Sequence, residues 1–447
     1  MSSVSIHVGG GGVNLGVEYW SIAAREAHCK ERPDGLALAS PRGVVRRRSP
    51  LFDARSGHAR AIFVDGDCRS VEAAGARLGA GCVASANLVG GADRGCGKCF
   101  GDGLLRRAYL VAAAEERLRV EAERCARLST VTLAFDLEGG SAGLAAALCQ
   151  NCRDDYANAT ILGAVTSRRG FGSPLAPYNA AFALQQLREF SDATLWRDLR
   201  EVEAKDERRA APAADAAPFA LDLAALTLPR RDWLGDRLVD VAFRGDRDVV
   251  AKARPDPRLF LLDARSTLSR PAHAARADAG DWAKLAIRLA DAYPRADAVL
   301  DRPVLACAAA AVVRGAASAG FRPPLGALRR RLNPDLRRGA PGAVLFEPRS
   351  TSLSGGPALA AAKGDGGANP RRRGLAAVAC LNLAPALVVG YVDKVEKLRG
   401  ARAFLHRYEA AGLEGDDVAA AVEALCELVD DYDARFGYLQ DLSLIHI

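Results

Sequence analysis

The sequence predicts an α/β fold with a parallel sheet in its first domain, a central connecting helix, a second α/β domain and C-terminal helices. Three observations predict this fold. Short apolar runs alternate with helical patterns over residues 1–200, an order typical of parallel strands joined by helices. Glycine-rich turns follow several of the apolar runs. Residues 391–441 contain only helical patterns.

The strands of the first domain are expected where apolar residues run without interruption, and its helices where they recur every three to four residues. The predicted strands are Val4–Val8, Ala61–Asp65, Thr130–Leu137 and Thr160–Val165, and the predicted helices are Leu15–His28, Leu104–Arg127, Leu144–Asp155 and Pro177–Phe190. Ligands of open parallel sheets bind beyond the carboxyl ends of the strands. Residues 1–203 are therefore expected to form one ligand-binding domain.

Three glycine-rich turns lie at strand exits, at Gly9–Gly12, Gly90–Gly103 and Gly139–Gly143. Helix N-termini carry unpaired N–H groups and a partial positive charge, and glycine lets a phosphate approach them closely. Three such turns predict a nucleotide held by several loops at one edge of a sheet.

The second half of the chain begins with residues 204–218, which are charged and then rich in Ala and Pro, as is typical of a linker. A connecting helix is expected at 219–240. A second α/β domain is expected at 241–390, with strands at Leu259–Asp263, Val304–Val313 and Leu375–Leu383.

Residues 391–441 are expected to form the C-terminal helices. Leu398–Tyr408 is one of them, and the acidic pair Asp416 and Asp417 begins a second. Residues 442–447 read as the translation of a sequencing adapter, so we leave them out of the expected fold.

Composition excludes several classes of protein. The chain has 447 residues, 49% of them hydrophobic and 26% charged, so a packed core is available. The net charge is +7, but the basic residues form no stripe interleaved with aromatic residues, so we expect no nucleic-acid partner. Eleven Cys without a signal peptide favour a reducing compartment, the cytoplasm. The most apolar run, Leu305–Val313, is too short to cross a membrane, so we expect no membrane partner.

Taken in order, five landmarks resemble the tubulin family. The similar segments are Val8–Glu18 (the first nucleotide loop), Ala61–Asp67 (a strand end), Gly139–Leu144 (the GGTGSG signature with one residue deleted), Tyr178-Asn179 (part of PYN) and Phe404–Tyr408 (FLHWY). Within the family, the strings Cys29–Arg32, Gln150–Asn158 and Ala403–Asp417 are most similar to delta-tubulin, and another divergent centriolar tubulin is the open alternative.

The resemblance implies binding of GTP or GDP together with Mg²⁺. The nucleotide-binding residues that it implies are Gly9, Gly10, Gly11, Gly12, Gly91, Ala92, Arg94, Gly139, Gly140, Ser141, Gly143 and Phe219. It places Asp65 and Asp67 near the magnesium, and Mg²⁺ commonly uses one or two carboxylates plus phosphate. The alternative for this pair is a strand-end Asp that caps a turn.

This chain departs from the family pattern at several of these positions. Gly10 and Gly11 replace a Gln and a Cys, and Arg94 replaces an Asn that faces the terminal phosphate. Phe219 stands where an aromatic ring stacks on guanine, with an ordinary core residue as the alternative. Asp222 is a candidate acceptor for the guanine N–H groups, because Leu223 replaces an expected Asn.

In the family, hydrolysis uses an acid supplied across the longitudinal contact to the next subunit's nucleotide. Spacing from Arg254–Pro257 indicates Asp248 for this role, with Asp236 as a competitor and a solvated surface Asp as the alternative. A carboxylate that polarises water must lie within hydrogen-bond reach of it. We therefore expect at most a slow GTPase that depends on assembly.

The resulting hypothesis is a tubulin-like, GTP-binding cytoskeletal protein that acts at centrioles, basal bodies, cilia and other microtubule structures. Its implied partners are other tubulins in head-to-tail contact and centriole, basal-body or microtubule proteins. The alternative keeps the fold but has a degenerate nucleotide site and a purely structural role. A Rossmann-type oxidoreductase fits less well, because Gly9–Gly12 lacks the third spaced glycine.

Overall fold

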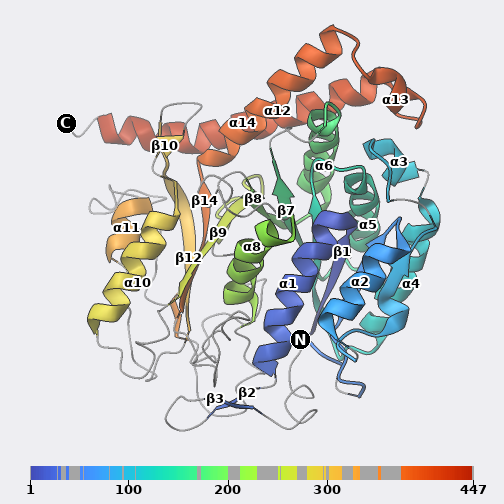
Figure 1. Cartoon of the computed structure of the whole chain (residues 1–447). Coiled ribbons are helices and arrows are strands. Elements are labelled where there is room, and N and C mark those ends of the chain that lie inside the picture. The colour runs from blue at the N-terminus through green and yellow to red at the C-terminus, as the bar shows by residue number, and fades with distance from the viewer. Residues whose placement is uncertain are drawn as a thin grey trace.

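In the computed structural model, a ten-stranded sheet runs through the molecule, with helices on both of its faces (Figure 1). The structure describes residues 2–27, 29–31, 37–39, 51–53, 55–79, 81–92, 95–105, 107–168, 173–199, 212–228, 250–251, 253–268, 279–294, 296–297, 302–314, 326–332, 351–353 and 374–444. The strand order is β13-β12-β14-β9-β8-β7-β6-β1-β4-β5. The predicted α/β fold is confirmed.

The first part of the chain alternates strands and helices as its apolar pattern predicts. Its elements are β1 (Ser2–Val8), α1 (Gly9–Ala27), β2 (Cys29–Glu31), β3 (Ala37–Ala39), β4 (Ala61–Asp65), α2 (Cys68–Leu78), β5 (Leu88–Gly90), α3 (Phe100–Leu105), α4 (Ala108–Glu123), β6 (Leu128–Asp136), α5 (Ser141–Asp155), β7 (Thr160–Ser167), α6 (Ala176–Phe190) and β8 (Ala193–Asp198).

The second part contributes the remaining strands and the C-terminal helices. Its elements are α8 (Pro212–Thr227), β9 (Leu261–Leu268), α10 (Ala279–Ala292), β10 (Ala296–Asp297), β11 (Arg302–Pro303), β12 (Ala306–Arg314), α11 (Gly326–Leu332), β13 (Thr351–Leu353), β14 (Gly374–Leu381), α12 (Leu383–Gly400), α13 (Leu405–Glu409) and α14 (Gly415–Leu444). None of the described helices combines the length and apolar character needed to cross a membrane.

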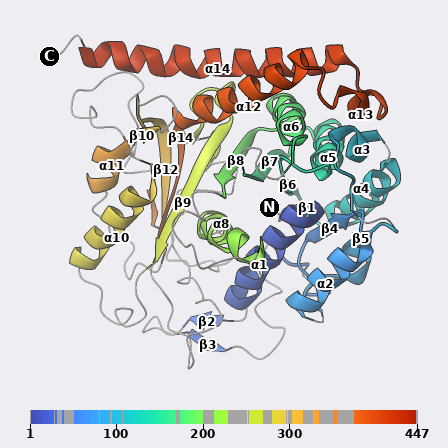
Figure 2. The same cartoon turned by 45° about the horizontal axis from the view of Figure 1, so that its top comes forward.

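Neighbouring strands from β5 to β9 are all parallel. Strands β1, β4 and β7 are almost completely buried, as expected for a parallel sheet covered on both faces. Helices α1, α2 and α8 cover one face, and α4, α5 and α6 cover the other (Figures 1 and 2). The carboxyl ends of β1, β4, β5 and β6 therefore meet at one edge.

Strand β8 joins the two parts of the chain in one sheet. It pairs with β7 on one side and with β9 on the other, where Thr194 and Leu195 lie opposite Leu261 and Leu262. Beyond β9, strand β14 is antiparallel to both β9 and β12, and β12 pairs with β13 in parallel. The sheet is thus continuous across residues that the sequence assigns to two domains.

Two helices begin earlier than their apolar periodicity predicts. Helix α1 starts at Gly9 rather than Leu15, because glycines carry no apolar signal although they form its first turn. Helix α8 starts at Pro212, inside the segment expected to be a linker, and it continues through Pro218. This segment is rich in Ala, which has the highest helix propensity of all residues. Packing of α8 on α1 and β9 then stabilises the helix. Residues 229–249 lie outside the described residues.

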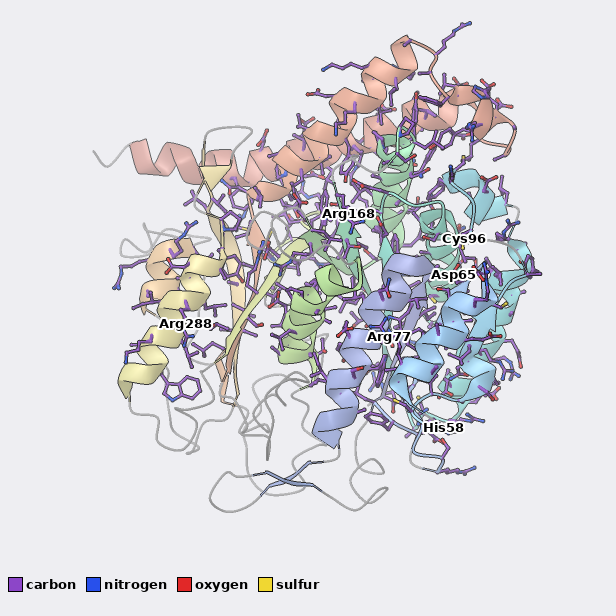
Figure 3. All side chains as sticks on the ribbon, in the orientation of Figure 1. His58, Asp65, Arg77, Cys96, Arg168 and Arg288 are labelled. Atoms are coloured by element: carbon purple, nitrogen blue, oxygen red, sulfur yellow. The ribbon has the colours of Figure 1, made fainter. Side chains whose placement is uncertain are left out.

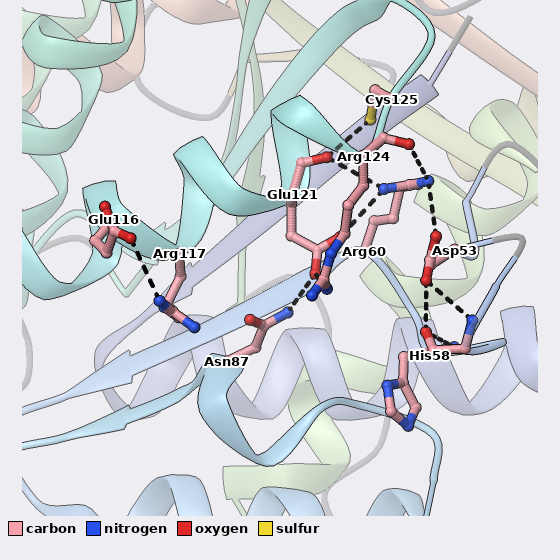
Figure 4. A network of polar contacts seen from close by, with 10 residues as sticks. Asp53, His58, Arg60, Asn87, Glu116, Arg117, Glu121, Arg124 and Cys125 are labelled. Atoms are coloured by element: carbon pink, nitrogen blue, oxygen red, sulfur yellow. Dashed lines mark hydrogen bonds and ion pairs between the residues drawn. The ribbon is translucent and has the colours of Figure 1, made fainter.

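A buried ion-pair network lies at the edge opposite the strand exits (Figure 4). Arg60 donates to a carboxylate oxygen of Glu121 at 3.2 Å and to the carbonyl oxygen of Arg124 at 3.2 Å. Asn87 donates to the other Glu121 oxygen at 3.1 Å, and Asp53 lies 3.5 Å from Arg60. Arg60 and Glu121 are buried, so each charge depends on the other.

The C-terminal helices lie along one side of the molecule, and α14 extends over elements of both parts of the chain (Figures 1 and 2). Helices α12 and α14 pack against each other and both contact α6, and the short helix α13 lies near α3 (Figure 2). The predicted acidic start of the last helix is present, because Asp416 and Asp417 lie in the first turn of α14.

Candidate functional site

The three glycine turns and the end of β4 lie against one another at the carboxyl edge of the sheet. A Cβ added at Gly9 would clash with Ser141, and one added at Gly140 would clash with the carbonyl oxygen of Gly97. A Cβ at Gly91 would lie 2.7 Å from the carbonyl oxygen of Gly66. Gly9 therefore packs against the Ser141 side chain, whereas Gly140 and Gly91 pack against backbone, and all three positions require glycine.

Two helices begin at this edge. Helix α1 starts at Gly9, whose φ of 66° is in the left-handed region that glycine tolerates. Helix α5 starts at Ser141, directly after Gly139 and Gly140. The first turns of both helices lie at the same edge, so the partial positive charges of two helix N-termini add there.

Gly10 is the exposed residue of the first turn. A Cβ added there would meet nothing within 4 Å, whereas one at Gly11 would lie 2.8 Å from the Cβ of Asp136. A Cβ at Gly12 would clash with the carbonyl oxygen of Ala134, and one at Gly143 with that of Phe100. The predicted residues Gly11, Gly12 and Gly143 thus serve close packing, and Gly10 faces open space.

The end of β4 is joined to the segment that follows β5. The N–H of Gly91 donates to the carbonyl oxygen of Asp65 at 2.9 Å. The N–H of Cys68 donates to the carbonyl oxygen of Gly91, also at 2.9 Å. Asp67 and Ala92 form an isolated antiparallel bridge. Figure 3 shows Asp65 and Cys96 at this edge, with His58 at the opposite end of the same strand.

Asp65 and Asp67, the predicted magnesium residues, have different surroundings. Asp65 is buried and accepts a hydrogen bond from the Asp67 N–H at 3.2 Å. Burial raises the pKa of the Asp65 carboxyl, and the nearby Asp67 charge acts in the same direction. Asp67 accepts from the Arg69 N–H at 3.0 Å, which caps α2, and forms an ion pair with the Arg69 side chain. Asp67 therefore performs the capping role that the sequence left open as an alternative.

The oxygen donors at this edge fit a magnesium ion only in part. Carboxylates are suitable ligands for Mg²⁺, and Asp65 ends β4 at the same edge as the N-termini of α1 and α5. Across the described part of the chain, no group of three His, Cys, Asp or Glu residues could hold a metal ion. Water and phosphate oxygens would have to complete the coordination shell of a magnesium at Asp65.

Sequence reasoning missed one carboxylate at this edge, Asp136. It ends β6, directly beside Gly11, and accepts from the Glu138 N–H at 2.9 Å. Burial raises the pKa of Asp136 to about 6, and the nearby negative charge of Glu138 acts in the same direction. An Asp at a strand end before a glycine turn is the signal that identified Asp65, and it could have identified Asp136.

Replacing Asp136 by Asn is expected to stabilise the folded protein at pH 7.5 by about 1–2 kcal/mol. The folded-state pKa lies above the unfolded value, so the ionised carboxylate is penalised in the fold. The wild-type protein gains stability as the pH falls through about 6 and towards 3.8. The advantage of Asp136→Asn should therefore shrink between pH 7.5 and pH 5, as measured by urea unfolding. If Asp136→Asn is more stable than wild type by the same amount at both pH values, the raised pKa of Asp136 is contradicted.

The residues expected to recognise guanine are buried in the protein. Phe219 is fully buried, and the Arg197 guanidinium lies 5.5 Å from the centroid of its ring. Asp222 accepts from Ser266 at 2.5 Å and pairs with Arg197 through its other carboxylate oxygen. Both Asp222 oxygens are engaged inside the protein, which opposes the interpretation that they accept from guanine. Leu223 is buried as well.

Three of the predicted site residues, Arg94, Asp236 and Asp248, lie outside the described residues. Two cysteine pairs have C-x-x-C spacing, Cys96 with Cys99 and Cys149 with Cys152, and all four thiols are buried. Cys149 and Cys152 are buried in α5, and burial raises the pKa of the Cys149 thiol to about 12. A thiol that stays protonated is a poor metal ligand.

Part of the chain is similar to a known protein family. Residues 2–198 match the family model described as Tubulin/FtsZ family, GTPase domain. Comparison with curated proteins gave no match. The matched segment contains all three glycine turns and both Asp65 and Asp67, and it ends at the last residue of β8.

Proposed function

We propose, from the premise that residues 2–198 form a tubulin-like GTPase domain, that this protein binds GTP and GDP at the carboxyl edge of the sheet. The observation that carries the proposal is the convergence of three glycine turns and two helix N-termini at this edge. Backbone N–H groups at helix N-termini are suited to phosphate groups.

In this proposal the protein supplies mainly positioning and backbone hydrogen bonds. The first turns of α1 and α5, including Gly10, Gly11 and Ser141, face the phosphates. Asp65, assisted by Asp67, would hold Mg²⁺ at this edge, and the ion would neutralise phosphate charge when bound. Arg94 acts as a further phosphate ligand, and Phe219 supports the base from within the core.

For hydrolysis we propose that Asp248, with Asp236 as the alternative, polarises water at the nucleotide of the next subunit. The protein is then at most a slow GTPase whose turnover depends on assembly. Its partners are other tubulins in head-to-tail contact, and its site of action is the cytoplasmic cytoskeleton, at delta-tubulin locations such as centrioles, basal bodies and cilia. A tagged chain in ciliated cells should concentrate at basal bodies, and a uniform distribution would oppose this part of the proposal.

A titration with fluorescent GTP in excess Mg²⁺ tests nucleotide binding directly. We expect a Kd of about 10 µM or tighter, with competition by GTP and GDP and weaker binding in EDTA. ATP at the same concentration should compete poorly. Binding that needs millimolar nucleotide would contradict the proposal.

A second candidate function is a purely structural partner of other tubulins with a degenerate nucleotide site. The observation that favours it is Asp136, whose carboxylate lies beside Gly11, where a negative charge repels phosphate. Failure of the titration, together with co-sedimentation of the protein with other tubulins, would favour this candidate.

A further inference from the structure

The side chain of Asn179, in α6, joins segments that are far apart in the sequence. Its Oδ1 accepts from the Phe100 N–H at 2.8 Å and from the Tyr408 hydroxyl at 2.8 Å. Its Nδ2 donates to the carbonyl oxygens of Lys98 and Glu138, both at 2.9 Å. Asn179 is fully buried, and all four of its hydrogen-bonding positions are used. The Tyr408 hydroxyl hydrogen is shared with the Leu175 carbonyl oxygen at 3.2 Å. The Phe100 N–H faces the amide oxygen and two carbonyl oxygens face the amide nitrogen, so this network allows only one orientation of the amide.

Three of these four bonds end on the glycine turns of the candidate site. Lys98 and Phe100 belong to the turn that follows β5, and Glu138 directly precedes Gly139. The two turns contact each other mainly through backbone, since Gly140 lies against Gly97 and Gly143 against Phe100. Asn179 is therefore a side chain that holds both turns at a fixed separation.

The fourth bond links the same turns to the C-terminal helices. Tyr408, in α13, is buried, and its ring lies 5.8 Å from that of Phe182, which stacks on Phe100 at 5.2 Å. Tyr391, in α12, donates its hydroxyl hydrogen to Glu138 Oε1 at 2.6 Å. Helices α12 and α13 thus each contact one of the segments that Asn179 holds.

We propose that Asn179 is the residue that positions the two turns for the nucleotide, and that α13 controls nucleotide affinity through the Tyr408 hydroxyl. This inference rests on the proposed nucleotide binding. A partner that moves α13 would alter the Tyr408–Asn179 bond, change the separation of the turns and so change the affinity for nucleotide. Because coupling between two sites is reciprocal, nucleotide binding would stabilise one position of α13 by the same free energy by which that position strengthens nucleotide binding.

The test compares Tyr408→Phe with Tyr178→Phe in the full chain. The two rings lie 5.1 Å apart in one aromatic cluster, and each variant loses one buried hydroxyl. The Tyr178 hydroxyl donates to the Ala403 carbonyl oxygen at 3.2 Å, and Ala403 lies outside both turns. The two variants should therefore have similar melting temperatures. Fluorescent GTP should bind about 5- to 10-fold more weakly to Tyr408→Phe and within about 2-fold of wild type to Tyr178→Phe.

Hydrogen exchange of the nucleotide-free protein supplies a measurement that does not depend on GTP. The amides of residues 98–103 and 138–143 should exchange faster in Tyr408→Phe and in Asn179→Asp, which loses both Nδ2 donors, than in Tyr178→Phe. Equal affinities and equal exchange in the two Tyr→Phe variants would overturn the inference. If exchange differs as expected but no variant binds GTP, the positioning role stands and the proposed nucleotide binding, with its control by α13, is wrong.

Discussion

Replacing Glu121 by Ala is expected to lower the free energy of unfolding by about 2–4 kcal/mol, because it leaves the buried Arg60 guanidinium with Asp53, at 3.5 Å, in place of two carboxylate partners. Glu121 is 1% exposed and Arg60 is 4% exposed, so water cannot replace the lost carboxylate. The change also removes the acceptor of Asn87 and of the Arg124 side chain. Urea unfolding at pH 7.5 measures the effect.

Glu116→Ala is the matched control for this prediction. Glu116 lies on the same helix, α4, and pairs with Arg119, but its side chain is 49% exposed. An exposed ion pair contributes little, so this variant should unfold close to wild type. A loss below about 1 kcal/mol for Glu121→Ala would contradict the importance of burial in this network.

The parts of the fold that the sequence predicts well are those whose signal is local. Strand β4 has the predicted bounds, and β6 and β7 differ from prediction by two residues or fewer at each end, because buried parallel strands read as uninterrupted apolar runs. Strand β8 was missed, since its run contains Arg197 and Asp198, and the burial of Arg197 depends on partners from α8 and β9. Those partners are distant in sequence and carry no local signal.

The candidate site shows the same division. Gly9–Gly12 and Gly139–Gly143 are visible in the sequence because a turn that needs bare backbone needs glycine. Asn179 forms bonds to residues as far as 229 positions away, so its role appears only when the chain is folded. Asp222 illustrates the opposite error, because a carboxylate near an expected base site was read as free, whereas Arg197 and Ser266 engage it.

The prediction with the largest expected effect on nucleotide binding concerns Gly10. Replacing Gly10 by Val should weaken the binding of fluorescent GTP at least about 100-fold, or about 2.7 kcal/mol. Gly10 is exposed in the first turn of α1, and an added Cβ meets nothing within 4 Å, so the fold has room for the side chain. In the proposed complex the phosphates occupy that space, and the two methyl groups of Val would keep them from the backbone N–H groups.

Gly390→Val separates this steric effect from a general effect on helices. Gly390 lies in α12, and a Cβ there also meets nothing within 4 Å, so both variants place the same β-branched side chain in open space on a helix. Both should unfold within about 1 kcal/mol of wild type, while only Gly10→Val should lose GTP binding. Undiminished binding by a folded Gly10→Val protein would mean that phosphate does not approach the start of α1. The helix N-termini at this edge would then contribute to the packing of the fold and would not form a nucleotide site.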